Sequence, residues 1–454
     1  MRRASKWCAT TCCAATTSPT SRPSGCASCR NNLSFPLRRP RHTMFRLSTS
    51  SAFHARRLAA VLLLAGGSAA GLRAQGVVVQ GRVVDERQQP VPFVSVALPD
   101  GSRGTATNEV GEFRLRLATP APEIVVFGVG YQRTTAPVPA GNQPLTVRLP
   151  TSVVALPEVR VSSQQHAAAL VQRAYAKLLR HQADAYYGKG FYRQKTSQNQ
   201  QYREFFDAFA DIRFTPQKID GWDLGEARFA YTPGGVDFTN FSAITRLLPL
   251  FQTATEPPGR VMLPLSPAGL KALTFKLESY LTEQGRELAV VSFAPPAGTP
   301  DAATGRLYID PSTAALHRLA LELPARSMFN VGETKGSGVS YEGATLRLTT
   351  DLVPVADSLT RLASKRAELD MHFMVREAFP EDVHVSSYFL VYQLTPKLPN
   401  QPYAAMSPQT NDLQQIRKRR YNPQFWRDNE IIRASPVEER VVRDFEGRKV
   451  FGRL

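Results

Sequence analysis

Cysteine is missing from nearly the whole chain. All five cysteines of the 454 residues fall within the first 43 positions. Beyond that segment, no disulfide can hold the fold and no thiolate can act as a nucleophile. Two of the five have the Cys-x-x-Cys spacing of a redox or zinc pair, but no second pair or histidine cluster follows them. The cysteines are Cys8, Cys12, Cys13, Cys26 and Cys29.

Histidine is scarce as well, and the motifs of common hydrolases are absent. No His-Glu-x-x-His stands in the sequence to hold a catalytic zinc, and no Gly-x-Ser-x-Gly presents a nucleophilic serine. These absences exclude zinc peptidases and serine hydrolases of those types. We therefore expect no cofactor, no metal and no catalytic residue. The histidines beyond residue 74 are His166, His181, His317, His372 and His384.

Acidic residues are absent from the first 74 positions, which hold twelve Lys or Arg. The formal net charge of +18 therefore comes mainly from this segment, because residues 75–454 carry 44 basic and 38 acidic residues, a net charge of +6. So mild an excess gives no case for binding nucleic acid. We expect no nucleic-acid partner.

The N-terminal apolar run is too short for a membrane-spanning helix. It covers Leu58–Ala70, follows a basic stretch that begins after Met44, and leads to a small-residue cleavage site at Ala74. Gly67 stands where a lipoprotein would need cysteine. We expect residues 1–43 to be a disordered or wrongly assigned upstream extension and residues 44–74 to be a signal peptide.

On this interpretation the mature chain is exported, lies in the periplasm or is associated with the outer membrane, and has no transmembrane helix. The start remains open between Met1 and Met44. If translation begins at Met1, the apolar run lies inside the chain and can act as an anchor instead.

What the sequence does contain is alternation. Over residues 75–150, apolar and polar residues alternate with a period of two, and turn residues recur at short, even intervals. This pattern predicts a small antiparallel β-sandwich. Asn108 and Gly111 suit a tight turn that needs a positive φ, while Phe113 and Tyr131 supply large buried rings.

The same segment resembles a known domain through a set of glycines, turn residues and buried apolar residues. The set is Gly81, Val83, Asp85, Pro90, Val94, Val96, Gly104, Thr105, Thr107, Asn108, Gly111, Phe113, Gly130 and Tyr131. It resembles the carboxypeptidase regulatory-like domain, a transthyretin-type sandwich found at the start of many bacterial envelope proteins. The resemblance implies a fold and is nearly silent on chemistry.

After a linker over residues 151–163, a helix is predicted over residues 166–182, where Ala and Leu recur at helical spacing. Residues 190–195 and 202–212 then resemble an uncharacterised envelope family that often follows the regulatory-like domain. Gln194 and Asp207 stand where that family has glutamate.

The spacing of the acids in this passage allows two structures. A period of two over residues 202–212 predicts a β-hairpin in which Glu204 pairs with Arg193 or Lys195 across the strands. In the alternative structure, Glu204, Asp207 and Asp211 share one face of a helix and bind a cation. The hairpin fits the pattern at least as well as the helix, and we favour it.

Residues 220–267 are typical of loops, with a short helix over 244–251. Alternating segments then continue to Leu394, with a turn at Asp310 and a break over 351–357. The fold class is therefore mainly β: a small antiparallel sandwich, a linking helix, and a large curved antiparallel sheet, half-barrel-like, over residues 164–400. This passage distantly resembles the curved sheet of bacterial lipoprotein carriers. A membrane barrel would alternate too, but proline-rich loops of uneven length favour the open sheet.

The C-terminal extension, residues 401–454, holds a cluster of basic and aromatic residues around Arg419, Arg420 and Trp426. Such a cluster can hold phosphates or stack on bases. It can also be a solvated turn beside an aromatic ring that packs on the sheet, which is the interpretation we favour. Anionic lipid or glycan is the ligand in the functional variant.

Two functions of different class remain. The first is a non-catalytic envelope protein that binds an envelope protein partner, or an apolar, lipid or glycan ligand, with Arg193, Glu204, Arg419, Arg420 and Trp426 as candidate interaction residues. The second is an envelope enzyme that uses Glu204, Asp207 and Asp211 in hydrolytic or metal-dependent chemistry. The enzyme requires these acids to meet in one cleft; the binding protein does not.

Overall fold

The computed structural model describes residues 77–154, 164–233, 238, 241–254, 261–283, 286–296, 303–324, 339–356, 359–375, 379–403, 412–416 and 419–451. The predicted extension, the signal peptide and most of the linker lie outside these ranges. Within the ranges, every helix is too short or too polar to span a membrane.

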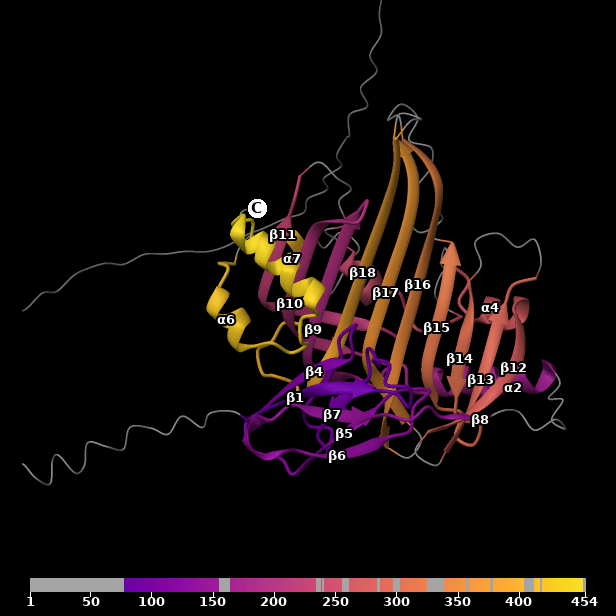
Figure 1. The fold of residues 1–454 in the computed structure, drawn as a ribbon. Coiled ribbons are helices and arrows are strands. Elements are labelled where there is room, and N and C mark those ends of the chain that lie inside the picture. Colours follow the sequence, from indigo (N-terminus) through magenta and orange to yellow (C-terminus); the bar gives the residue numbers. More distant parts are fainter. Residues whose placement is uncertain are drawn as a thin grey trace, which may run out of the picture. The chain divides into compact units, whose positions relative to one another are not determined.

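The N-terminal part is a sandwich of two small sheets (Figure 1). The alternation seen in the sequence buries one face of each strand, so that Val83, Val96, Phe113 and Ile124 are all fully enclosed between the sheets. One sheet has the order β4-β1-β7, from Val77–Val84 (β1), Glu112–Leu117 (β4) and Leu145–Arg148 (β7). The other has the order β3-β2-β5-β6, from Ser95–Ala97 (β2), Gly104–Ala106 (β3), Glu123–Phe127 (β5) and Thr134–Pro137 (β6), with a short 3-10 turn, η1 (Ala140–Asn142), before β7.

The sandwich prediction is confirmed with one difference. Gly111 has a φ of 75°, and its amide donates to the Asn108 carbonyl at 3.0 Å, as expected for the tight turn. The pairing of β1 with β7, however, is parallel and not antiparallel. The chain between β6 and β7 runs through η1 and brings β7 alongside β1 in the same direction.

The second part is one open antiparallel sheet of eleven strands among the described residues, in the order β11-β10-β9-β18-β17-β16-β15-β14-β13-β12-β8. The pairing of β9 with β18 joins the first and last strands of the chain's second part, so the edges of the sheet are β11 and β8. The strands are Val153–Val154 (β8), Tyr186–Gln198 (β9), Gln201–Phe214 (β10), Ile219–Tyr231 (β11), Thr274–Glu283 (β12), Arg286–Ala294 (β13), Thr304–Ile309 (β14), Leu316–Pro324 (β15), Val339–Ala356 (β16), Leu359–Val375 (β17) and Phe379–Leu394 (β18).

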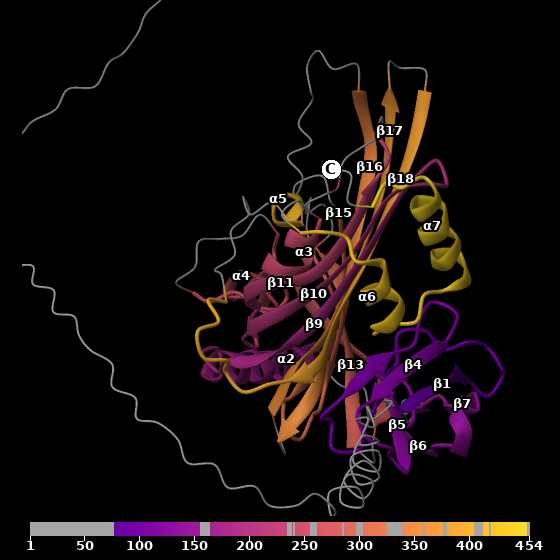
Figure 2. The same cartoon turned by 90° about the vertical axis from the view of Figure 1, so that its left-hand side faces the viewer.

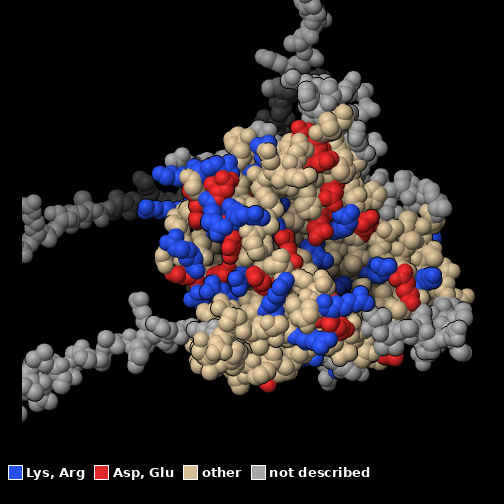
Figure 3. Space-filling view, in the orientation of Figure 1, with Lys and Arg blue, Asp and Glu red and all other residues tan. Residues whose placement is uncertain are grey.

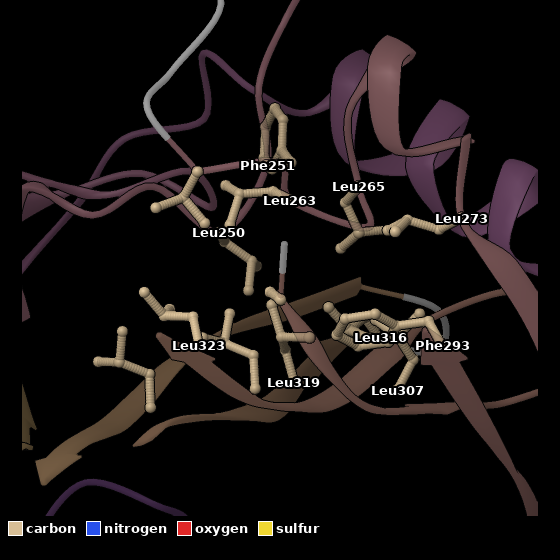
Figure 4. Close-up of a cluster of buried hydrophobic side chains, with 14 of the residues drawn as sticks. Leu250, Phe251, Leu263, Leu265, Leu273, Phe293, Leu307, Leu316, Leu319 and Leu323 are labelled. Atoms are coloured by element: carbon tan, nitrogen blue, oxygen red, sulfur yellow. The ribbon is translucent and has the colours of Figure 1, made fainter. Parts of the chain in front are cut away.

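Helices cover both faces of this sheet, as Figure 2 shows. On one face lie α2 (Gln164–Arg180), α3 (Ser242–Leu247) and α4 (Pro267–Ala272), which pack on a continuous apolar core. Leu263, Phe293, Leu307 and Leu319 lie in this core among other closely packed side chains (Figure 4). On the other face lie α6 (Pro423–Asp428) and α7 (Pro436–Gly447), while α5 (Asp412–Ile416) packs near β11.

Most of the predicted elements of the second part are present. The helix expected over 166–182 is α2, the short helix over 244–251 is α3, and the hairpin over 190–212 is β9–β10. The turn at Asp310 is also confirmed, because its Oδ1 accepts from the Ser312 amide at 2.8 Å and the Thr313 amide at 3.1 Å.

Two expectations about this part are wrong. The loop predicted over 220–267 begins with a thirteen-residue strand, β11, whose alternation is interrupted by Gly221 and Gly225. The break predicted over 351–357 does not occur, because β16 continues to Ala356 and accommodates an irregularity in pairing after Asp351. A local bulge thus replaces the loop that the polar residues suggested.

The close approach of β1 to β7 generates a prediction. A Cβ added to Gly81 would lie 1.9 Å from the carbonyl oxygen of Leu145. We expect Gly81→Ala to lower the free energy of unfolding by about 1–3 kcal/mol, because the two backbones must separate. Urea denaturation measures this loss. Gly343→Ala is the control, since its Cβ meets nothing within 4 Å, and an equal loss in both variants would contradict the steric explanation.

Candidate functional site

The β9–β10 hairpin carries most of the residues singled out in the sequence, but it divides them between two faces. Its register places Arg193 opposite Asp207 and Thr196 opposite Glu204. Residues opposite each other in an antiparallel pair point to the same face, and neighbours along a strand point to opposite faces. Arg193 and Asp207 therefore share one face, and Glu204 lies on the other.

The predicted pairing of Glu204 with Arg193 or Lys195 is wrong for this reason. A register shift between Tyr202 and Glu204 inserts Arg203 as an extra residue in β10. Without the shift, Glu204 would lie opposite Lys195, as the sequence suggested. The alternative, a helix that gathers three acids, is also wrong, because residues 201–214 form a strand.

On the face that α6 and α7 cover, Asp207 forms the centre of a buried ion network. Its side chain is fully buried and lies between two guanidinium groups. Arg193 Nε is 2.8 Å from Oδ1, and Arg228 Nη2 is 2.6 Å from Oδ2. Burial alone would raise the pKa of the Asp207 carboxyl, but the two guanidinium groups outweigh it and hold that pKa below the usual value.

Two further carboxylates complete the network. Glu438 of α7 accepts from Arg193 Nη1 at 3.1 Å and from Lys195 Nζ at 3.2 Å. Lys195 also pairs with Glu109 of the sandwich. Burial opposes ionisation of Glu438, yet Arg193 and Lys195 lower its pKa overall. Likewise, burial opposes the charge on Lys195, and the two glutamates raise its pKa overall.

Aromatic rings enclose this network. The Arg228 guanidinium carbon lies 4.6 Å from the ring centroid of Trp426 and 5.3 Å from that of Phe205. Trp426 is 8% exposed and packs against Phe209, with ring centroids 5.5 Å apart. Trp426 therefore packs on the sheet.

The two arginines of the C-terminal cluster take a different position. Arg419 is exposed and donates to the backbone carbonyl of Leu224 in β11, and Arg420 is exposed too. Of the three tail residues singled out from the sequence, only Trp426 contacts the ion network.

The opposite face of the hairpin holds Glu204 in a separate environment. Glu204 is fully buried; its Oε2 accepts from Thr196 Oγ1 at 2.7 Å, and its Oε1 accepts from the Phe238 amide at 3.1 Å. Gln194 donates to the Phe238 carbonyl at 3.1 Å. Glu204 and Gln194 thus hold the backbone at residue 238. Asp211, further along β10, is partly exposed and pairs with Lys189 at 2.9 Å.

A pocket lies beside the ion network, between residues of the sandwich, of the sheet and of α7. Arg193, Lys195 and Glu438 line it together with Asn108, Glu109 and Arg366. Its volume of about 40 Å³ holds a few water molecules and no substrate of ordinary size.

Sequence reasoning missed Glu438 and Arg228 as members of the network. A signal for Glu438 exists, because Ser435-Pro-Val-Glu438 is the start of a helix with a capping box, and the structure contains that box. Arg228 carries no comparable signal, since it lies in the strand that was predicted as a loop.

Lys365 is the second unusual ionisable group. It is 4% exposed on β17, and its Nζ donates to the Leu248 carbonyl at 2.8 Å. Burial lowers its pKa to about 8. A neutral amine is a nucleophile in principle, but this one is enclosed by the protein and bonded to its backbone.

The histidines stay apart from these groups. His372 contacts Asp382 at 2.6 Å and His384 contacts Asp370 at 2.7 Å, both as exposed cross-strand pairs. Among the residues that the structure describes, no three His, Asp or Glu side chains lie close enough to hold a metal ion.

Comparison with protein families identifies the first part of the chain. Residues 79–161 match the family described as the CarboxypepD_reg-like domain. This match confirms the resemblance read from the sequence, and a β-rich domain follows the matched segment. Comparison with curated protein sequences gives no match.

Among solved structures, three similar ones illustrate the range. A LolA superfamily protein from Nitrosomonas europaea has 10% identity and a TM-score of 0.17, covering 52% of this chain and 97% of that chain. A DUF1329 family protein from Desulfovibrio piger has 9% identity and a TM-score of 0.22, covering 52% and 97%. The MucA/MucB complex of Pseudomonas aeruginosa has 9% identity and a TM-score of 0.17, covering 51% and 99%. Similarity at this level establishes no shared function.

The ion network predicts the response to acid. Because the carboxyl pKa of Asp207 is lower in the folded chain than in the unfolded one, its stabilisation is complete above about pH 5 and is lost as the pH falls. We expect Asp207→Asn to lower the free energy of unfolding by about 3–5 kcal/mol at neutral pH, since both arginines stay buried without their partner.

Asp211→Asn is the matched control on the same strand, with an expected loss below about 1 kcal/mol because its ion pair is partly exposed. Urea denaturation of both variants at pH 7 and pH 4 makes the comparison. Equal losses in the two variants would show that the buried network does not stabilise the fold as described.

Lys365 predicts the opposite dependence on the alkaline side. Its pKa of about 8 in the folded chain lies below that of an unfolded lysine, so the unfolded chain binds more protons between these values. We therefore expect the stability of the protein, relative to Lys365→Met, to rise by about 2 kcal/mol from pH 7 to pH 9.5. Urea denaturation at both pH values measures this, and a constant difference would refute it.

Proposed function

We propose that this protein is a non-catalytic, exported protein of the cell envelope that acts as an adaptor for a protein partner. The observation that carries the proposal is the division of the candidate acids: Asp207 and Glu204 lie on opposite faces of β10. An acid–base pair or a metal centre needs such groups to converge on one reacting position.

The state of each acid supports the same conclusion. Asp207 stays ionised between Arg193 and Arg228, with a lowered pKa, so it is a poor base at neutral pH. Glu204 accepts hydrogen bonds from Thr196 and from the backbone at residue 238. Both carboxylates are fully buried and hold parts of this chain together.

An adaptor is favoured over a lipid carrier by the packing of the large sheet. A carrier needs an apolar hollow of several hundred Å³ to enclose an acyl chain. Here the apolar face of the sheet is occupied by the chain's own side chains, from α2, the segment after α3, and strands β12–β17 (Figure 4). Leu250, Leu265, Leu307 and Leu323 are all at most 3% exposed in this cluster.

The contacts between the sandwich and the rest support a rigid body. Lys195 binds Glu109 of the sandwich, Arg114 of the sandwich lies 3.2 Å from Glu430, and Arg433 lies 3.2 Å from Glu112. A binding protein whose parts are fixed before it meets its partner loses less conformational entropy on association. The expected export through residues 44–74 places this role in the envelope.

Native mass spectrometry of protein purified from the envelope tests the proposal. We expect the mass of residues 75–454 without bound lipid, plus a complex with a second polypeptide in fixed ratio. Lys195→Met should weaken that complex, because it releases the sandwich from α7, whereas Arg443→Gln on the exposed side of α7 should not. A lipid adduct that disappears on organic extraction would replace the adaptor by a carrier.

A further inference from the structure

A second and much larger hollow lies on the outer side of the β9–β10 hairpin. It is a groove of about 510 Å³ between the hairpin, the end of β11 and one side of α7. That volume lies in the range of sites for small organic ligands. The groove is lined by Gln201, Tyr202, Arg203, Thr232, Val437, Arg440, Val441, Asp444 and Arg448.

The charge of the groove is strongly one-sided. Three arginines line it and only one acid, Asp444, which is 2.5 Å from Arg448 Nη2 and is already paired. Arg203 and Arg440 form no ion pair with any residue that the structure describes. In Figure 3, Lys and Arg side chains gather over the region of α6 and α7.

Arg203 is held in a way that its neighbours in the sheet are not. It is the extra residue of the bulge in β10, and its backbone carbonyl accepts from the Thr232 amide at 2.8 Å. Its Nε is buried and has no hydrogen-bond partner. A buried donor without a partner costs free energy, and bulges commonly re-aim a side chain at a site of function.

We propose that this groove binds a phosphate group carried by a larger organic ligand. Two guanidinium groups without an acid offer a charge of +2, which matches the charge of nearly −2 on a phosphomonoester at neutral pH. Guanidinium groups bind phosphate oxygens in pairs of hydrogen bonds, and the unpartnered Nε of Arg203 supplies one such donor.

The rest of the groove suits the organic part of the ligand. Tyr202, Val437 and Val441 give it an apolar lining beside the arginines, and Thr232 and Gln201 add polar groups. Thr232 Oγ1 accepts from Arg448 Nη1 at 3.3 Å, so Arg448 is fixed at the rim by Thr232 and Asp444 together.

The contrast with the network around Asp207 separates a structural cluster from a binding site. There, each guanidinium group has a carboxylate of this chain within 3.2 Å. In the groove, Arg203 and Arg440 have none among the described residues, although α7 contributes to both places. The proposal does not rest on the adaptor function and stands or falls separately from it.

Isothermal titration of the protein with inorganic phosphate, glucose 6-phosphate and glucose tests the proposal. We expect glucose 6-phosphate to bind more tightly than inorganic phosphate, and glucose not to bind. Arg203→Gln and Arg440→Gln should each weaken binding about tenfold, since each removes a charged hydrogen-bond donor. Arg443→Gln is the control: it makes the same change on the same helix at a residue that does not line the groove.

Vesicles distinguish the source of the phosphate. Binding to vesicles of phosphatidylcholine with phosphatidic acid, lost in Arg203→Gln and Arg440→Gln, would assign the phosphate to a lipid headgroup; binding of glucose 6-phosphate alone would assign it to a soluble ligand. Thermal melting of each variant verifies folding. The proposal is overturned if no phosphorylated probe binds, if the control loses binding equally, or if hexaglutamate binds more tightly than glucose 6-phosphate, which would indicate an acidic peptide.

Discussion

The carboxylate of Asp207, buried between Arg193 and Arg228, is the interaction on which the second part of the molecule depends. Strand β10 is covered on both faces: one packs in an apolar cluster with Phe206 and Ile212, and the other lies under α6 and α7. Removing several charges from water costs several kcal/mol for each ion unless they are matched. The chain matches them by alternating carboxylate and guanidinium groups, and this fixes which elements can cover β10.

That requirement explains why three distant segments meet at one hairpin. Glu438 caps the start of α7 through Ser435 and also binds Arg193, so the helix can pack here only in one orientation. Glu109 brings a loop of the sandwich to Lys195. Trp426 closes the network from solvent over Arg228. The same charges that resemble an active site in the sequence therefore serve as the joint of the structure.

Much of this fold follows from periodicity alone. A period of two predicts the sandwich and most strands from β12 to β18, and helical spacing predicts α2. Strand β11 escapes prediction because Gly221 and Gly225 interrupt its alternation, although Trp222 and Phe229 are buried in it. The helices of the C-terminal extension are short and depend on caps, at Asn422 and Ser435, that precede proline. Contacts such as Arg193 with Glu438, which lie 245 residues apart, are set by tertiary packing and carry no local signal.

The bulge at Arg203 shows how one residue separates a correct secondary structure from a wrong site. The tight turn at Asn199 and Gln200, both with positive φ, pairs Gln198 with Gln201 and would bring Glu204 opposite Lys195. One extra residue moves the register by one position, which sends Glu204 to the opposite face and leaves Asp207 to meet Arg193. The residue that disturbs the pairing is the same one that lines the groove beside α7. A single irregularity thus both assembles the buried network and leaves an arginine outside it, and this is why the two clusters of charge on neighbouring turns of the chain have different roles.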